Sequence, residues 1–146
     1  MKRILSIVIT AILAGAFAVA SLAPASASSE KWALHLTKEC HEFTGAAGSF
    51  CTITSSNLEM IPRNSRVFYL DPVFTTSGLD TDIVLYAGPG NSAIGHVTLA
   101  VPSGPGTVTF FGGTGRLRHF NATAVVSSLG DPNWAWDGTY HFNEDR

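Results

Sequence analysis

Charged residues are scarce in this sequence, and none of them form a basic cluster. Asp, Glu, Lys and Arg make up 14% of the 146 residues, and the formal net charge is −2 at pH 7. Nucleic-acid binding depends on a basic patch or stripe that neutralises phosphates. The sequence therefore predicts no nucleic-acid partner.

Motifs for metals and cofactors are also lacking. The five histidines are scattered, and their spacing from the cysteines and acids matches no known zinc site. Residues 88–93 have the glycines of a dinucleotide fingerprint, but a strand-like segment follows where the fingerprint needs a helix N-terminus. No Gly-x-Ser-x-Gly nucleophile elbow is present. We predict no metal and no cofactor.

Cysteine is limited to Cys40 and Cys51. Oxidising compartments favour pairing of two such residues, which would close a short loop and add about 3 kcal/mol of stability. Two alternatives stay open: a metal site shared with His35 and His41, or a catalytic thiol. We predict a Cys40–Cys51 disulfide.

The one long apolar run is at the N-terminus. Lys2 and Arg3 precede apolar residues 4–20, and Ala25-Ser26-Ala27 supplies the small-x-small pattern of a cleavage site. The alternative is an uncleaved membrane anchor, because the run is nearly long enough to span a bilayer. We expect a signal peptide at residues 1–27, a secreted or periplasmic location, and no membrane contact after cleavage. The mature residues 28–146 hold seven basic and eleven acidic residues, a formal charge of −4.

The mature part contains no convincing helical pattern. Eight segments rich in Val, Ile, Thr, Phe and Tyr are separated by Gly- and Pro-containing turns. They cover residues 31–37, 50–55, 65–70, 80–87, 94–101, 107–111, 119–127 and 134–142. Short connections favour antiparallel neighbours in an up-and-down order. We predict one all-β domain at residues 28–146, an eight-stranded antiparallel up-and-down barrel with room for one small ligand; a β-sandwich is the alternative.

Alternation along the segments predicts which side chains share a face. Ile83 and Leu85 oppose Asp82, while Val97 opposes His96. The outward face often carries small or apolar residues, which favours packing against other subunits. A further aromatic face suits either a ligand cavity or an ordinary core; it consists of Trp134, Trp136, Tyr140 and Phe142.

Residues 111–120 (FGGTGRLRHF) resemble the Gly-Gly-Thr-Gly turn and following strand of plant dirigent proteins, and allene oxide cyclases have a similar turn. The hairpin of residues 79–98 and the closing segment 136–142 are similar to bacterial exported proteins with an allene-oxide-cyclase-like barrel. The resemblance implies an eight-stranded barrel, a homotrimer, and either an isomerase that cyclises an unstable epoxide or a protein that steers phenoxy-radical coupling. The catalytic residues of the plant enzymes do not map onto this chain.

Six residues are candidates for a site. Asp82, His96 and Asp137 are the candidate catalytic groups, because a carboxylate and an imidazole can exchange protons near neutral pH. Trp136 and Tyr140 are candidate cavity walls, and Arg116 could bind a carboxylate. Each has a structural alternative: a solvated strand start, a turn, a core aromatic or a surface ion pair.

Two functions follow from these observations. The first is an exported barrel that binds a small apolar molecule and steers its cyclisation or coupling, as an isomerase if it is an enzyme. The second is a non-enzymatic secreted barrel that has a structural or partner-binding role. An interior open at one mouth and holding a carboxylate or imidazole favours the first, and an interior packed solid by Phe, Trp and Leu favours the second.

Overall fold

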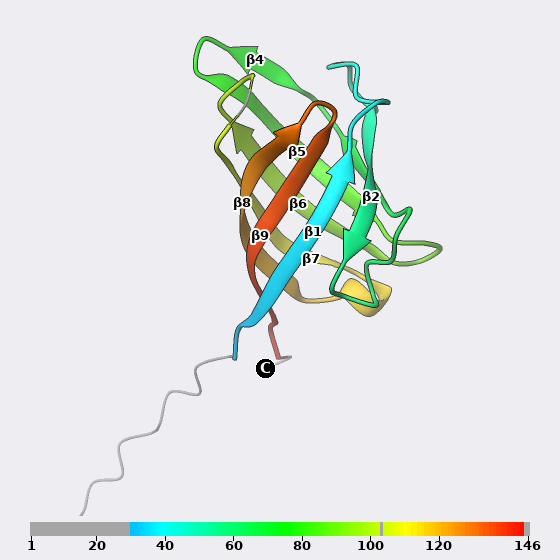
Figure 1. The fold of residues 1–146 in the computed structure, drawn as a ribbon. Coiled ribbons are helices and arrows are strands. Elements are labelled where there is room, and N and C mark those ends of the chain that lie inside the picture. The colour runs from blue at the N-terminus through cyan, green and yellow to red at the C-terminus, as the bar shows by residue number, and fades with distance from the viewer. Residues whose placement is uncertain (1–29, 103, 145–146) are drawn as a thin grey trace, which may run out of the picture.

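The described part of the protein is a closed β-barrel (Figure 1). The structure is a computed structural model, and it describes residues 30–102 and 104–144. The predicted signal peptide of residues 1–27 lies outside the described residues. Within the described ranges, no helix is long and apolar enough to cross a membrane.

The described residues form nine strands joined mostly by short turns. The strands are β1 (Trp32–Glu39), β2 (Phe50–Ser56), β3 (Arg66–Tyr69), β4 (Val73–Thr75), β5 (Gly78–Tyr86), β6 (Ser92–Leu99), β7 (Gly106–Thr114), β8 (Phe120–Gly130) and β9 (Asn133–Phe142). One 3-10 turn, η1 (Gly115–Leu117), connects β7 to β8.

Neighbouring strands pair antiparallel, and two pairings close the ring. β1 pairs with β9, and β3 pairs with β5. β3 and β4 pair with successive parts of β5, so they occupy one position in the wall. The ring therefore has eight members in up-and-down order, which confirms the predicted all-β, eight-stranded antiparallel barrel. The β-sandwich alternative is wrong, because two stacked sheets would not close in this way.

Most strands begin or end one to three residues away from the predicted bounds, and two differences matter for the wall of the barrel. β4 was not predicted; it has three residues, and all of them are exposed. Gly112, Gly113 and Thr114 were predicted as a turn but extend β7, and the chain turns one step later in η1. A side chain at Gly113 would place its Cβ 2.1 Å from the carbonyl oxygen of Ser92, so glycine lets β7 approach β6 here.

One half of the barrel interior is packed by aromatic side chains. Phe110 lies at ring-centroid distances of 5.7 Å from both Phe120 and Trp136. Phe120 also packs against Tyr140 and Phe142. The predicted inward residues Ile83, Leu85 and Val97 are buried, as the strand alternation requires. This half is a solid core.

The Cys40–Cys51 disulfide is present, which confirms the predicted pairing. It joins the residue that follows β1 to the second residue of β2. The loop it closes lies at the end of the barrel that also carries β4 (Figure 1). The first and last described residues lie at the opposite end.

Candidate functional site

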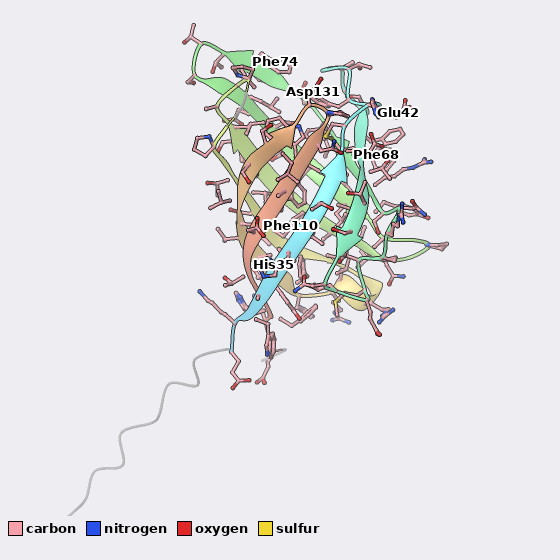
Figure 2. The ribbon with its side chains drawn as sticks, viewed as in Figure 1. His35, Glu42, Phe68, Phe74, Phe110 and Asp131 are labelled. Carbon is pink, nitrogen blue, oxygen red and sulfur yellow. A yellow bond between two sulfur atoms is a disulfide. The ribbon has the colours of Figure 1, made fainter. Side chains whose placement is uncertain are left out.

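A cavity of about 220 Å³ opens at the β4 end of the barrel. Its walls come from the last part of β1 and the loop after it, from β3 to β6, and from the β8–β9 hairpin. Most of the side chains are apolar; the lining residues are Lys38, Cys40, Phe43, Tyr69, Phe74, Leu79, Val97, Leu99, Val101, Pro102, Val126, Asp131 and Trp134. Figure 2 shows two of them, Phe74 and Asp131, at this end.

The rim of the cavity carries exposed apolar side chains. Phe74 lines the cavity and is 53% exposed. Val101 also lines it and is 47% exposed. Large exposed apolar groups gathered around one opening are typical of a site that binds an apolar partner.

Two charged residues line the cavity, Lys38 and Asp131, and Lys38 is the buried one. It continues the inward series of Leu34 and Leu36 along β1, and only 4% of its surface is exposed. Its Nζ lies 4.5 Å from the ring centroid of Trp136 and 5.2 Å from that of Tyr69. Nζ also donates a hydrogen bond to Tyr69 Oη at 2.5 Å. Two residues therefore surround the amine: Trp136 with its ring, and Tyr69 with its ring and its hydroxyl.

Burial changes the protonation chemistry of this pair. Desolvation lowers the pKa of Lys38 from 10.5 to about 7, because the charged amine loses its water. Desolvation also raises the pKa of Tyr69, so its hydroxyl keeps its proton at neutral pH. No ion pair joins Lys38 to a carboxylate anywhere in the described residues. Near neutral pH, a substantial fraction of Lys38 is a free amine.

Two further polar groups lie close to Lys38. Tyr69 Oη is 3.4 Å from Cys51 Sγ, and a disulfide sulfur carries no hydrogen, so the hydroxyl is the donor. In the part of the chain that the structure describes, Trp136 Nε1 is the buried side-chain nitrogen without a hydrogen-bond partner. An amine and a phenol therefore meet on the lining of the cavity, and the ring of Trp136 lies beside the amine.

Asp82 and His96 lie on the outer wall of the barrel. His96 bridges two carboxylates there: its Nδ1 is 2.7 Å from Asp82 Oδ1, and its Nε2 is 3.0 Å from Asp80 Oδ1. All three side chains are well exposed, and none of them lines the cavity. The cavity lies on the inner side of the wall, away from both side chains. The catalytic role predicted for Asp82 and His96 stays a prediction.

The remaining candidates are spread over the molecule. Asp137 is also exposed on the outer wall, where its Oδ1 is 2.7 Å from His35 Nδ1. Arg116 is exposed in η1, and its backbone N–H donates to Asn91 Oδ1. Tyr140 packs in the filled half of the barrel. Of the six, only Trp136 contacts the groups at the base of the cavity, through Lys38.

Sequence reasoning missed Lys38 and Tyr69, although the signal for both was present. In Trp32–Glu39, a strict alternation places Lys38 on the same face as two leucines. In Arg66–Tyr69, it places Tyr69 on the face of Val67. Successive side chains of a strand point to opposite faces, so residues two apart share a face. A lysine two residues after inward-facing leucines is therefore expected to be buried.

A larger hollow of about 690 Å³ lies on the outer wall along β5, β6 and β7. Outward-facing Asp80, Thr98 and Thr107 line it, together with Leu79, Leu99, Ala100, Pro105, Val125 and smaller residues. It is a broad open depression, so it lacks the enclosure that a small ligand needs. The mouth cavity is the better candidate site.

Comparison with known proteins gave no relatives. The chain matches no protein-family model. It also matches no curated protein and no solved structure. The geometry of the barrel and its cavity is therefore the basis for proposing a function.

Proposed function

We propose that this protein is an exported, allene-oxide-cyclase-like barrel that binds one small apolar molecule in the mouth cavity. The observation that carries the proposal is a mostly apolar cavity that opens at one end of a barrel whose other half holds an aromatic core. The Cys40–Cys51 disulfide supports export, because such bonds persist in oxidising compartments.

The size of the cavity limits the ligand. An engineered apolar cavity of about 150 Å³ accommodates benzene, and drug-sized ligands occupy clefts of about 300–1,000 Å³. The cavity of about 220 Å³ suits a molecule somewhat larger than benzene, or the end of a longer chain. The exposed side chains of Phe74 and Val101 can then cover the part of a longer ligand that extends beyond the mouth.

Binding in such a cavity can also direct a reaction. Rigid walls that hold a flexible molecule in one conformation favour one ring closure or one coupling product. The isomerase-type activity implied by the family resemblance would use the cavity in this way, with Lys38 as the polar group that orients the molecule. The supporting feature is the pairing of apolar walls with one polar anchor.

The first experiment is ligand-observed saturation-transfer NMR with hexan-1-ol, an uncharged molecule of suitable size. We expect transfer to the alkyl chain for the unmodified protein. Leu99→Phe adds a ring to a half-buried cavity wall and should abolish the transfer. Thr98→Phe adds the same ring to the neighbouring exposed position on the outer wall and should leave it intact. Equal transfer to both variants would overturn the proposal.

Native mass spectrometry of protein purified from its producing cells is the second experiment. A retained small molecule would identify the natural ligand class, and the intact mass would also test the predicted homotrimer. We expect one bound apolar molecule per subunit, which is lost from the Leu99→Phe variant. Protein that carries no ligand and also shows no hexan-1-ol transfer would favour the non-enzymatic alternative.

A further inference from the structure

We propose that Lys38 is a carbonyl-reactive amine, and that the mouth cavity captures an apolar aldehyde or ketone as an imine on Lys38 Nζ. This inference rests on the proposed function, because it names the ligand class of the same cavity. It depends on three features of the described residues: the position of Nζ, its neighbours and the charge around the mouth.

The position of Nζ suits attack on a ligand carbonyl. Lys38 lines the cavity while nearly all of its surface is buried, so a ligand that enters the mouth meets the amine at the end of an apolar space. The rings of Trp136 and Tyr69 hold the amine from the sides. A restricted amine next to a bound carbonyl gains the advantage of proximity over an amine in solution.

The neighbours of Nζ leave it available for reaction. Tyr69 Oη is its hydrogen-bond partner, and no carboxylate of the described residues pairs with it. A lysine without a counter-ion in a desolvated site is a typical activated nucleophile. Desolvation lowers the pKa of Lys38 to about 7, so the unprotonated amine is abundant at neutral pH.

The charge around the mouth favours a neutral ligand over an anion. Asp131 lies at the rim, and the predicted mature chain has a net charge of −4. A carboxylate ligand would be repelled on entry and would meet an amine that is only partly charged. A neutral carbonyl compound meets no such barrier. The charge around the mouth thus favours neutral ligands, and aldehydes and ketones are the neutral class that an amine can capture as an imine.

The chemical step needs no further reagent. The Nζ lone pair adds to the carbonyl carbon, and one amine proton moves to the carbonyl oxygen to give a carbinolamine. Loss of that oxygen as water, with the second amine proton, leaves a C=N bond. Tyr69 keeps its hydroxyl proton and hydrogen-bonds to Nζ, so it can pass a proton between nitrogen and oxygen.

Reductive trapping tests the inference. The purified protein is incubated with hexanal and cyanoborohydride at about pH 7, and the product is analysed by intact mass and peptide mapping. Lys31 is the matched internal control, because it is the other lysine of the predicted mature chain and is exposed at the start of β1. An ordinary lysine with a pKa of about 10.4 has a free-amine fraction on the order of 10⁻³ at this pH. The N-terminal α-amine, with a pKa of about 8, also reacts, so the comparison is made between the two lysine peptides. We expect Lys38 to be labelled at least about tenfold faster than Lys31.

The outcomes separate this inference from the proposed function. If hexan-1-ol binds but hexanal labels Lys31 as fast as Lys38, the imine inference is wrong and the binding function stands. If neither compound binds, both proposals fail. Lys38→Arg cannot form the imine, so it should lose the hexyl adduct, while any labelling of Lys31 in the same sample should be unchanged. Should that variant fail to fold, peptide mapping of the unmodified protein still decides between the outcomes.

Discussion

Lys38 is a long polar side chain at a position that the strand alternation assigns to the core. An uncompensated amine in the interior lowers stability, because the charged form must give up its hydration. Among the described residues, the hydroxyl of Tyr69 and the rings of Tyr69 and Trp136 offset this loss. A residue that reduces stability at a cavity is typical of a functional site. The cost should be measurable through its dependence on pH.

The first prediction concerns Lys38→Met, which removes the charge and keeps a similar length. The folded pKa is about 7, and the unfolded chain has the ordinary value of 10.5, so between these values the unfolded state binds more protons. The stability of the unmodified protein therefore rises with pH in that window. We expect Lys38→Met to be more stable at about pH 7, by an amount on the order of a few kcal/mol, and the difference to shrink toward about pH 9.5.

Urea unfolding of both proteins at several pH values between these limits checks this prediction. The upper limit avoids tyrosine: burial raises the pKa of Tyr69, so above about pH 10 unfolded tyrosine loses its proton and both proteins lose stability. A stability difference that stays constant over the window would contradict the burial of a titrating Lys38.

The second prediction concerns the outer-wall group of His96 and its two aspartates. Exposed ion pairs contribute about 0–1 kcal/mol, because solvent screens them and ordering the side chains costs entropy. Asp82→Asn should therefore change the free energy of unfolding by less than about 1 kcal/mol and leave hexan-1-ol binding unchanged. Thermal unfolding and saturation-transfer NMR check both expectations. A loss of binding in this variant would restore Asp82 as a functional residue.

At the scale of elements, β8 and β9 approach each other closely at Gly138. A Cβ at this position would lie 2.0 Å from the carbonyl oxygen of Thr123 and 2.5 Å from Ala124 Cα. The backbone atoms of a closed barrel cannot move apart without disturbing the ladder on both sides. We expect Gly138→Ala to destabilise the protein by about 1–3 kcal/mol, as overpacked substitutions do.

The measurement for Gly138→Ala is the midpoint of urea unfolding. Thr139→Ala is the matched control, because Thr139 is the next residue of β9 and its side chain is exposed. We expect the control to change stability by no more than about 0.5 kcal/mol. Equal effects of the two substitutions would contradict the close approach at Gly138 as the cause of the loss.

Much of this architecture follows from alternation and turns in the sequence. Glycine and proline at the turns and branched or aromatic residues between them predicted all eight members of the ring. The inward faces of β5 and β6 were also correct, because Ile83, Leu85 and Val97 are apolar and their neighbours are polar. Closure could be predicted because eight antiparallel strands in sequence order leave two unpaired edges, and pairing of the first strand with the last removes both of them.

The candidate site was harder to predict because chemistry and position are separate signals. Asp82 and His96 are chemically suggestive, but alternation places them on the outer wall opposite Ile83 and Val97. Lysine is a common residue type, and the only signal for Lys38 is that it shares the inward face of its strand with two leucines. The cavity itself depends on how bulky side chains are distributed along the barrel axis, which no single strand reveals.

At the scale of the whole molecule, the barrel divides its interior between stability and binding. Phe110, Phe120 and Trp136 fill one half at close-packed distances, while the other half is left open around Lys38. The filled half supplies most of the buried aromatic surface, and such burial dominates core energetics. The other half can then contain a cavity and an amine without a carboxylate partner. Without the aromatic core, the free-energy cost of these two features would leave the barrel too unstable.

This division gives the last prediction. Phe120→Leu removes ring contacts in the filled half and should lower the free energy of unfolding by about 1–3 kcal/mol. Because Phe120 does not line the cavity, the dissociation constant for hexan-1-ol should stay within about twofold in this variant, a change of only about 0.4 kcal/mol. Leu99→Phe should show the opposite pattern, with little loss of stability and no binding. Titration by NMR and urea unfolding of the same samples measure both quantities. If Phe120→Leu weakens binding as much as it weakens folding, the two halves are one cooperative unit, and the cavity depends on the packed core for its shape.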